Sequence, residues 1–549
     1  MYKNIDYLEE RIAMKDVYGV DTMCTAKFLS STIYLQTGQT HSCYHPQPHN
    51  IPIEELVGNP SALHNTTHKK ERRKQMLNGK RPAECNYCWR VEDMGDEHIS
   101  DRIIKSKNEL LMTEDAHGEI IKKGWDYNYQ PTYLEISFGN ECNMKCAYCH
   151  PKASSAWQKE MVLYGPMKNA PSLQQLEETI YREENNPYLD AFWKWWVDLR
   201  ESLKVLRLTG GEPLLQQSIW RFLDMLDEFP CPDLILQVNS NLNIKNLLVK
   251  RFCDKVNKLL DEDKIKSFQM FSSLESWGER AVYARNGLDL ELWEENLDTI
   301  MTEFSKQTIV KFPGIIIMNT FNIMSVTSYV KFLKKILYWR TKYNTVNETS
   351  IIKFDIPHCT EPSQWALLGL PDDYDSYFTD ITAFFKKNAW DNNKSNYEIN
   401  DFHNVYFLYF NDEEIKSWDR VHSHWQQIKI DRASIVPPEH LTIDKIDDAR
   451  RNWSVFIKET DQRRNTNFLK VFPEMTSYYD LTYKLLDLAT TSYNQDIKKL
   501  MMQPSGMEVH IDDDFFYHHP SLAHNLIEYR KIKMYTTKIY DNDTLIDEF

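Results

Sequence analysis

The sequence predicts an α/β fold in its middle part, between a cysteine-rich amino-terminal segment and a mostly helical carboxyl-terminal region. Three observations lead to this prediction. Between about residues 128 and 365, six short runs with strand character alternate with segments of helical periodicity. Seven of the ten cysteines fall within the first 149 residues. Beyond about residue 366, Trp, Tyr and Phe recur at helical intervals.

The six predicted strands are short runs rich in β-branched and aromatic residues. They are YLEISF (133–138), VLRLTG (205–210), LILQVNS (234–240), FQMFSSL (268–274), GIIIMNT (314–320) and IIKFDIP (351–357). Segments such as FWKWWVDLRESL and LWEENLDTIMTEFSK between them predict helical crossovers. We therefore expect a parallel sheet, open or closed as a barrel. In the first of these helices, Trp193 or Trp196 is expected to pack on the sheet rather than bind a ligand.

The first segment, residues 1–115, holds short elements and turns. TIYLQTGQTHSCYH predicts two short strands around a Thr-Gly-Gln turn, which places Cys43 beside a hairpin. HKKERRKQMLNGKRPAEC predicts a helix that ends at Gly79, with Pro82 beyond it. We interpret its basic run, Lys69 to Lys74, as a solvated helix face, with binding of a partner as the alternative.

Composition excludes several classes of protein. Hydrophobic residues make up 42% and charged residues 26% of the 549 residues, which allows large cores. The net charge of −15 disfavours a protein that coats nucleic acid. There is no apolar run of about 18 residues and no signal-like start, so we expect a soluble, cytoplasmic protein without membrane contacts. In a reducing cytosol clustered cysteines indicate metal binding or catalysis, whereas Cys231, Cys253 and Cys359 are expected to be buried structural thiols.

The stretch ECNMKCAYCH places Cys142, Cys146 and Cys149 within eight residues. Thiolates suit zinc and iron–sulfur clusters. A structural zinc site needs four ligands, and His150 is awkwardly adjacent to Cys149. A four-iron cubane held by three thiolates would leave one iron open to a ligand. The loop follows the first predicted strand, at the carboxyl end where parallel α/β folds place their sites.

The second predicted strand runs into TGGEP. Gly210 and Gly211 expose backbone N–H and C=O groups, and Glu212 adds a carboxylate. A Gly-Gly-Glu-Pro sequence alone indicates only a turn. At the end of the strand that follows the three-cysteine loop, it indicates a binding site.

Together, CNMKCAYC and TGGEP resemble the radical S-adenosylmethionine (SAM) superfamily over about residues 130 to 360. The resemblance implies a partial, TIM-like (β/α)6 barrel at 128–365. It also implies a [4Fe–4S] cluster on Cys142, Cys146 and Cys149, whose open iron holds SAM. SAM is then cleaved to a 5′-deoxyadenosyl radical that abstracts hydrogen from a substrate. The resemblance further places Tyr148 near the adenine, and Gly210, Gly211 and Glu212 at the SAM amino group.

Two later segments match the superfamily less strictly. Asn239, in NSN, falls where a polar motif often ends the third strand, and a simple turn residue is the alternative. SSLESWGERAVYARNG resembles the fourth-strand segment, which implies that Ser273 and Arg285 contact SAM. Glu275 and Ser276 stand where many relatives have Asp-Gly, and Arg285 could instead form an ordinary ion pair.

Four earlier cysteines, Cys24, Cys43, Cys85 and Cys88, could bind zinc or an iron–sulfur cluster, and spacing alone does not decide. RRKQMLNGKRPAECNYCWRVEDMGDEHISDR resembles the twitch/SPASM auxiliary-cluster modules of radical SAM enzymes. This implies that Cys43, Cys85 and Cys88, with Cys24 as the fourth, hold an auxiliary cluster. Such modules usually follow the barrel, whereas here the segment precedes it. NFLKVFPEM (467–475) also resembles a helical segment of twitch-containing relatives.

Three functions are compatible with these residues. The first is a radical SAM oxidoreductase that modifies or cross-links a peptide or protein side chain, with a flavodoxin- or ferredoxin-like electron donor. The second keeps the radical chemistry but acts on a sugar, a nucleotide or another small metabolite. The third is a zinc-stabilised binding protein without activity. In the tail at 366–549, HIDDDFFYHHP (510–520) is interpreted as a surface loop, with a metal site as the alternative.

Overall fold

The computed structural model of the protein describes residues 19–95, 100–106, 115–165, 167, 180–344, 352–390, 408–434 and 442–485. All of them belong to one compact unit, Met1–Leu486. The sequence HIDDDFFYHHP lies outside the described residues, so neither interpretation of it is tested.

All six predicted strands are present and form one parallel sheet, as expected. They are β4 (Tyr133–Ser137), β6 (Val205–Thr209), β7 (Cys231–Ser240), β8 (Ile265–Ser273), β10 (Ile315–Met318) and β11 (Ile352–Asp355). Neighbours in the sheet are also neighbours along the chain, and every pair is parallel. Among the described residues the sheet does not close, since β11 forms one edge.

The amino-terminal hairpin belongs to the same sheet. The predicted pair is present as β1 (Ser30–Tyr34) and β2 (Gln39–His41), and β3 (His49–Asn50) follows. Strand β1 pairs in parallel with β4, with Thr32 opposite Glu135. The full order is therefore β11-β10-β8-β7-β6-β4-β1-β2-β3, and the cysteine-rich segment is hydrogen-bonded directly to the first strand of the α/β region.

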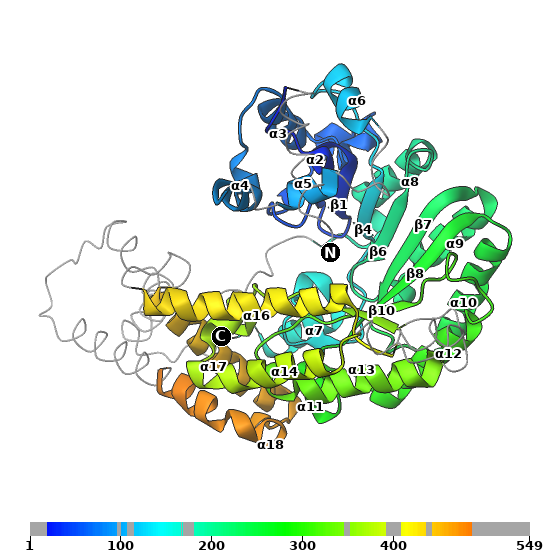
Figure 1. The fold of residues 1–549 in the computed structure, drawn as a ribbon. Coiled ribbons are helices and arrows are strands. Elements are labelled where there is room, and N and C mark those ends of the chain that lie inside the picture. Colours follow the sequence, from blue (N-terminus) through cyan, green and yellow to red (C-terminus); the bar gives the residue numbers. More distant parts are fainter. Residues whose placement is uncertain are drawn as a thin grey trace, which may run out of the picture. The chain divides into compact units, whose positions relative to one another are not determined.

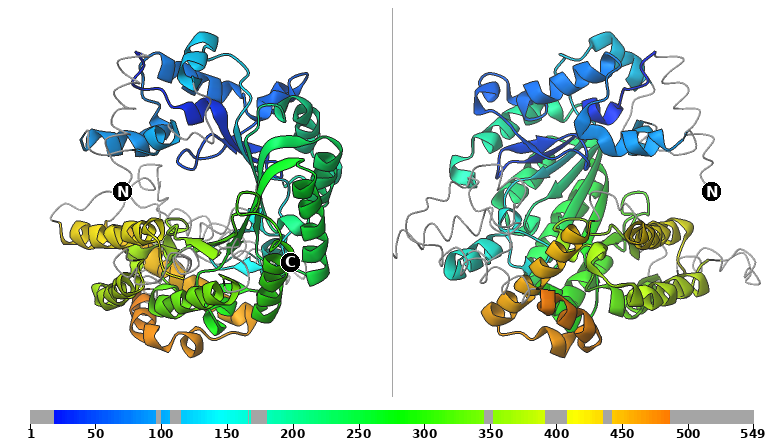
Figure 2. Two further views of the ribbon diagram at one scale, coloured as in Figure 1. Left: turned by 45° about the vertical axis from the view of Figure 1, so that its right-hand side comes forward. Right: turned by 90° about the vertical axis from the view of Figure 1, so that its left-hand side faces the viewer.

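Helices cover one face of this sheet (Figures 1 and 2). They are α8 (Pro187–Leu199), α9 (Gln217–Glu228), α10 (Asn246–Asp261), α12 (Leu290–Glu303) and α13 (Tyr329–Asn344). Trp196 is buried and packs edge-on against Phe222 of α9, at 4.7 Å between ring centroids. Trp193 stacks on Phe138 just beyond β4. The expectation that this aromatic cluster packs on the sheet is confirmed.

The opposite, inner face of the sheet is largely polar. Residues that alternate with the helix-facing ones point to it, because strand side chains alternate between faces. On β8, for example, Phe268 packs against Phe304, the residue that follows α12, so Gln269, Phe271 and Ser273 face the other way. The other residues of the inner face are Tyr133, Glu135, Arg207, Thr209, Gln237, Asn239, Ile316, Met318, Lys353 and Asp355. Barrel interiors that serve only as a core are filled with Val, Ile and Leu, so this face is suited to a polar ligand.

Short helices complete the amino-terminal segment: α2 (Thr25–Leu29), α3 (Thr67–Leu77), α4 (Asn86–Asp93), α5 (Asp101–Ser106) and α6 (Ala116–Lys123). Helix α3 is the predicted basic helix, and Gly79 follows its end with φ +71°.

The interpretation of the α3 basic run as a solvated face is wrong for two of its residues. Lys69 and Arg73 are 1% and 0% exposed. The Lys69 ammonium donates to Ser31 and Thr40 of the hairpin, and Arg73 donates to the Lys27 carbonyl. The polar partners on β1, β2 and α2 stabilise these cations inside, which the pattern of α3 alone could not indicate.

The region after 366 is mostly helical where the structure describes it, as expected. It contains α14 (Asp375–Lys387), α16 (Asp412–Ala433), α17 (Ile443–Arg464) and α18 (Phe468–Val471). These helices pack back onto the α/β region. Tyr283 of α11 (Glu279–Ala284) donates to Asp461 at 2.9 Å, and Arg464 reaches Glu160 of α7 (Ser155–Tyr164) at 3.1 Å. No helix in the described part of the chain has the length and apolar character needed to cross a membrane.

Candidate active site

The three-cysteine loop runs from the carboxyl end of β4 to helix α7, and polar side chains hold its backbone. The hydroxyl of Ser154 accepts from the Trp157 N–H as helix cap and donates to the Met144 carbonyl at 2.7 Å. The N–H of Ser155 donates to the Asn140 carbonyl, also at 2.7 Å. The loop is thus tied to the start of α7 at two points.

A short antiparallel pair fixes the middle of the loop. Strand β5 (Lys145–Cys146) pairs with β9 (Arg285–Asn286), with Cys146 opposite Arg285. The Ala147 N–H donates to the Ala284 carbonyl at 2.7 Å. This pairing brings the segment that follows β8 against the cysteine loop, although the two are 139 residues apart in sequence.

The three thiols are half-buried and act on one another electrostatically. Burial raises the pKa of Cys149 to about 12, and the charges of Cys146 and Cys142 add to this effect. Burial also raises the pKa of Cys142 to about 11, with a contribution from Cys146. A bound cationic centre would offset both effects, because thiolates are stabilised by a metal.

A single metal ion does not match the arrangement of the described side chains. Among them, no three Cys, His, Asp or Glu residues are grouped as one ion would require. A zinc ion sits about 2.3 Å from each thiolate, so its ligands must converge on one point. A cluster offers a separate iron to each thiolate and tolerates a wider set of thiols.

The Gly-Gly-Glu turn lies directly against the cysteine loop. The Gly211 N–H donates to the Gly139 carbonyl at 3.2 Å, and the Glu212 N–H donates to the Glu141 carbonyl at 2.6 Å. A Cβ atom on Gly211 would lie 2.3 Å from the Glu141 oxygen, so only glycine allows this approach. Gly210 has φ +112°, and a Cβ atom on it would lie 2.7 Å from the Gly139 carbonyl oxygen.

The Glu212 side chain ties the end of β6 to the end of β7. It is fully buried and accepts from the Ser240 hydroxyl at 2.8 Å and from the N–H groups of Asn241 and Leu214 at 2.6 and 3.3 Å. Burial raises the pKa of Glu212 to about 7. The carboxylate therefore has structural partners on both oxygens, in addition to the role toward a ligand that its motif predicts.

Of the NSN residues, it is Asn241 that reaches the cysteine loop. Its amide lies 3.9 Å from the Cys142 sulfur and donates to the Asn143 carbonyl oxygen of the side chain at 2.9 Å. Asn239, the residue predicted from the sequence, instead faces the inner side of the sheet and accepts from Arg207 at 3.0 Å. The two differ because Asn239 lies within β7, whereas Asn241 follows the last residue of β7, Ser240, so strand alternation no longer sets its direction.

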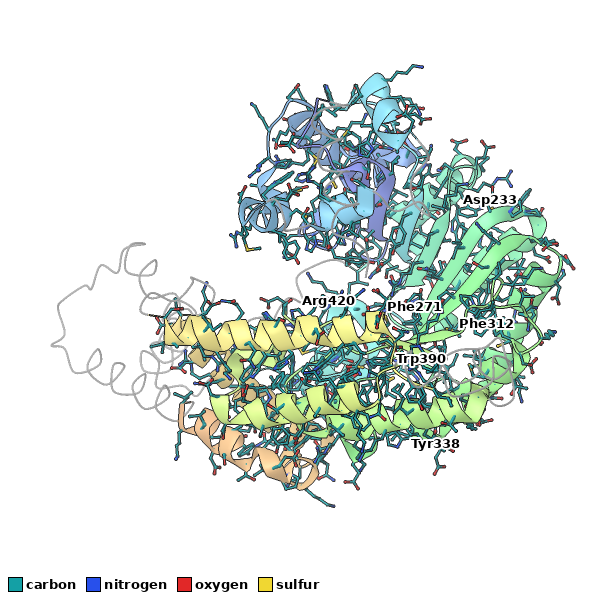
Figure 3. The ribbon with its side chains drawn as sticks, viewed as in Figure 1. Asp233, Phe271, Phe312, Tyr338, Trp390 and Arg420 are labelled. Carbon is teal, nitrogen blue, oxygen red and sulfur yellow. The ribbon has the colours of Figure 1, made fainter. Side chains whose placement is uncertain are left out.

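A polar network crosses the inner face beside the loop. The guanidinium of Arg207 lies 4.2 Å from the ring centre of Phe271, which is labelled in Figure 3. On the next strand, Glu135 accepts from Tyr44 at 2.5 Å and from Tyr133 at 3.4 Å. Tyr44 directly follows Cys43, so this network connects the amino-terminal segment to the inner face.

Tyr148, Glu275 and Arg285 form a buried cluster next to Cys146. The Glu275 carboxylate accepts from the Tyr148 hydroxyl at 2.9 Å and from Arg285 Nε at 2.7 Å. Arg285 also donates to the Tyr148 hydroxyl and lies 3.6 Å from the Cys146 sulfur. The sequence predicts roles for Tyr148 and Arg285. It predicts none for Glu275, which stands where many relatives have the Asp of Asp-Gly.

Ser273 stands at the carboxyl end of β8, two residues before Glu275. It is half-buried on the inner face and lies opposite Met318 of β10. The structure therefore brings Tyr148, Ser273 and Arg285 to the same end of the sheet as the cysteine loop and the Gly-Gly-Glu turn.

Part of the chain is similar to bacterial proteins named GTP 3′,8-cyclase. The protein from Campylobacter lari is 30% identical over 132 residues, which are 24% of this chain and 31% of the relative. That from Nautilia profundicola is 29% identical over 136 residues, or 24% and 36% of the two chains. One from Campylobacter jejuni is 30% identical over 151 residues, or 26% and 40%. No protein-family model matches the chain.

GTP 3′,8-cyclases are radical SAM enzymes. The similarity of this chain to them is consistent with the resemblance that the three-cysteine loop and the Gly-Gly-Glu turn indicate. In the matched segment the chain is similar to radical SAM enzymes. It matches about a third of the length of these relatives, so the resemblance is to a segment and not to the whole protein.

Radical SAM proteins use a [4Fe–4S] cluster and SAM, and the residues of this site fit both. Three thiols lie on one loop, and a buried guanidinium stands beside one of them. The Gly-Gly-Glu turn is hydrogen-bonded to the backbone of the same loop. The inner face next to it carries hydrogen-bond donors and acceptors.

The amino-terminal cysteines also gather at one place. Cys24, Cys43, Cys85 and Cys88 line a single small cavity, together with Lys27 and Arg102. Burial raises the pKa of Cys85 and Cys88 to about 12 each. Although burial alone would lower the pKa of Lys27, the charges of Cys85 and Glu84 raise it. The cavity thus combines four thiols with two buried cations that suit their ionised form.

Cys231, Cys253 and Cys359 are all buried, as expected of structural thiols.

Proposed function

We propose that this protein is a radical SAM enzyme that acts on a small polar molecule of the nucleotide class. The bonding of the Gly-Gly-Glu turn to the three-cysteine loop supports the chemistry, because it joins the two motifs of cluster and SAM binding into one site. When bound, the cluster and SAM supply a 5′-deoxyadenosyl radical that abstracts hydrogen from the substrate. The similarity to proteins named GTP 3′,8-cyclase supports the substrate class.

In this proposal the protein's residues bind and orient the two groups. Cys142, Cys146 and Cys149 hold the cluster. Gly210 and Gly211 let the turn approach the cysteine loop, and the backbone of the turn would bind the SAM amino group. Tyr148 would contact the adenine, and Ser273 would contact the ribose. Arg285 retains N–H groups for the SAM carboxylate beyond the three that its present contacts use.

The inner face of the sheet is the proposed substrate site. Arg207 and Asn239 offer donors, Glu135 offers an acceptor, and Phe271 offers an aromatic surface. A ligand with both a planar ring and polar groups would use all of them, which fits a nucleotide. A peptide or protein side chain is the second candidate, since auxiliary-cluster modules occur in enzymes of that kind, but the relatives favour the small molecule.

The substrate class can be tested with reconstituted protein under anaerobic conditions. SAM and dithionite should give slow release of 5′-deoxyadenosine, and GTP as a probe should accelerate this release several-fold. A cell extract separated by dialysis provides the comparison, with the small-molecule fraction expected to stimulate and the macromolecular fraction not. Stimulation by the macromolecular fraction alone, with no effect of GTP or of the small-molecule fraction, would contradict the small-molecule proposal and support the peptide alternative.

We further propose that the amino-terminal segment is a twitch/SPASM-like module with an auxiliary iron–sulfur cluster on Cys24, Cys43, Cys85 and Cys88. The shared cavity supports this proposal, as do the buried cations beside the thiols. A flavodoxin- or ferredoxin-like protein would supply the electron for the SAM site.

Metal analysis tests the auxiliary cluster. The double variant C85A/C88A should lose about half of the iron and sulfide of the reconstituted protein, because one of two four-iron clusters is missing. The double variant C231A/C253A, which removes two buried cysteines outside both sites, should keep all of it. If the C231A/C253A control contained zinc and the C85A/C88A variant did not, the amino-terminal segment would be a zinc site.

A further inference from the structure

Arg285 uses its guanidinium to connect three groups of the SAM site. Its Nε donates to Glu275 at 2.7 Å, one terminal nitrogen lies 3.6 Å from the Cys146 sulfur, and the other donates to the Tyr148 hydroxyl. The backbone adds a fourth connection, because Arg285 is the β9 residue opposite Cys146. The side-chain contacts and the backbone pairing therefore both hold Arg285 next to Cys146.

Burial makes these contacts strong and fixes them. The side chains of Arg285 and Glu275 are 4% and 1% exposed, so their ion pair is screened little by water. Glu275 holds Arg285 with one carboxylate oxygen, and the Tyr148 hydroxyl donates to that same oxygen. A planar guanidinium can serve a carboxylate, a phenol and a sulfur at once, whereas an ammonium cannot span them.

A hydrogen bond to a cluster sulfur favours the reduced cluster. Reduction adds one electron, and the added charge spreads onto the thiolates. A cation with an N–H group directed at one thiolate stabilises that charge, so it raises the reduction potential. A negative carboxylate held behind the cation fixes its direction but lowers the potential in part.

We propose that Arg285, held by Glu275 and Tyr148, is the positioning residue that sets the reduction potential of the SAM cluster through Cys146. This inference rests on the proposed function, since it requires a cluster on the three-cysteine loop. It gives Arg285 a task that does not depend on SAM. It also gives Glu275 a reason to replace the residue found in many relatives.

The test is a redox titration of the reconstituted protein without SAM. The electron paramagnetic resonance signal of the reduced cluster on the three-cysteine loop measures the reduced fraction. The parent and all variants carry C85A/C88A, so that only the cluster on the three-cysteine loop contributes to the signal. At the potential where half of the parent cluster is reduced, R285M should show a reduced-to-oxidised ratio about tenfold lower, which corresponds to 59 mV. R285K, which keeps the charge but not the fork, should lie between R285M and the parent.

Arg280 provides the matched control. It lies on α11, one turn before Arg285, and forms an ion pair with Glu474 at 2.8 Å. R280M should keep the parent potential. If R285M does not take up the cluster, R285K decides alone, and a parent-like potential in R285K would overturn the proposal. An R280M shift as large as that of R285M would overturn it as well. A parent protein without any SAM-cluster signal would instead contradict the proposed function.

Discussion

Replacing Cys146 with alanine is expected to reduce the release of 5′-deoxyadenosine to the level of a blank without protein. Cys146 is the central cysteine of the loop, and its strand pairs with β9. Without its thiolate the cluster has only two protein ligands on this loop. We expect that the whole cluster is then lost, and with it the iron that would bind SAM. The measurement is 5′-deoxyadenosine after anaerobic incubation with iron, sulfide, SAM and dithionite.

Cys253 offers a matched control for this experiment. It is a buried cysteine on α10, in the hydrophobic core between helices and sheet. C253A removes one sulfur from the core, at a cost of about 1 kcal/mol in folding free energy, and should cleave SAM as the parent does. Parent-like cleavage by C146A would show that the loop does not hold the reactive cluster.

Replacing Gly211 with alanine is expected to have the second-largest effect. The new methyl group would lie 2.3 Å from the Glu141 carbonyl oxygen and 2.7 Å from the Asn140 carbonyl carbon. Both are backbone atoms of the cysteine loop, so the strain cannot be relieved by moving a flexible side chain. We expect a loss of about 3 kcal/mol in the free energy of unfolding and a marked loss of cluster uptake. Denaturant unfolding of the apoprotein and iron analysis measure the two effects.

Gly124 serves as the control for the backbone effect of alanine. It ends α6 with φ +77°, and nothing lies within 4 Å of its hypothetical Cβ. G124A therefore carries only the backbone cost of a positive φ with ψ 177°, about 1–3 kcal/mol, and should take up the cluster normally. If G211A bound as much iron as G124A, the close approach of the turn to the loop would not matter for cluster binding.

The fold was predictable to the level of individual strands. All six strand segments carry a strong local signal, since their helix-facing residues are apolar and turns bound them. The helices α3, α8 and α12 were predictable for the same reason. The joining of β1 to β4 was not, because it depends on a pairing between segments about 100 residues apart, for which no local pattern exists.

The candidate site was predictable in its motifs but not in its contacts. The thiols, glycines and Tyr148 could be named because their spacing in the chain is short and characteristic. Glu275 could not be assigned a role, because its partners Tyr148 and Arg285 approach it only through the β5–β9 pair. Similarly, the sequence predicts Asn239 rather than Asn241, because it does not show where β7 ends relative to the loop.

The sequence by itself predicted the proposed class of chemistry and determined the six strands and the two groups of cysteines, because these depend on residues close together in the chain. Only the tertiary structure decided that Lys69 and Arg73 are buried, that four distant cysteines share one cavity, and that Arg285 faces Cys146. Each of these depends on contacts between distant segments. A buried charge or thiol is stabilised by a polar partner nearby in space. A local sequence pattern does not show which distant residue that partner is.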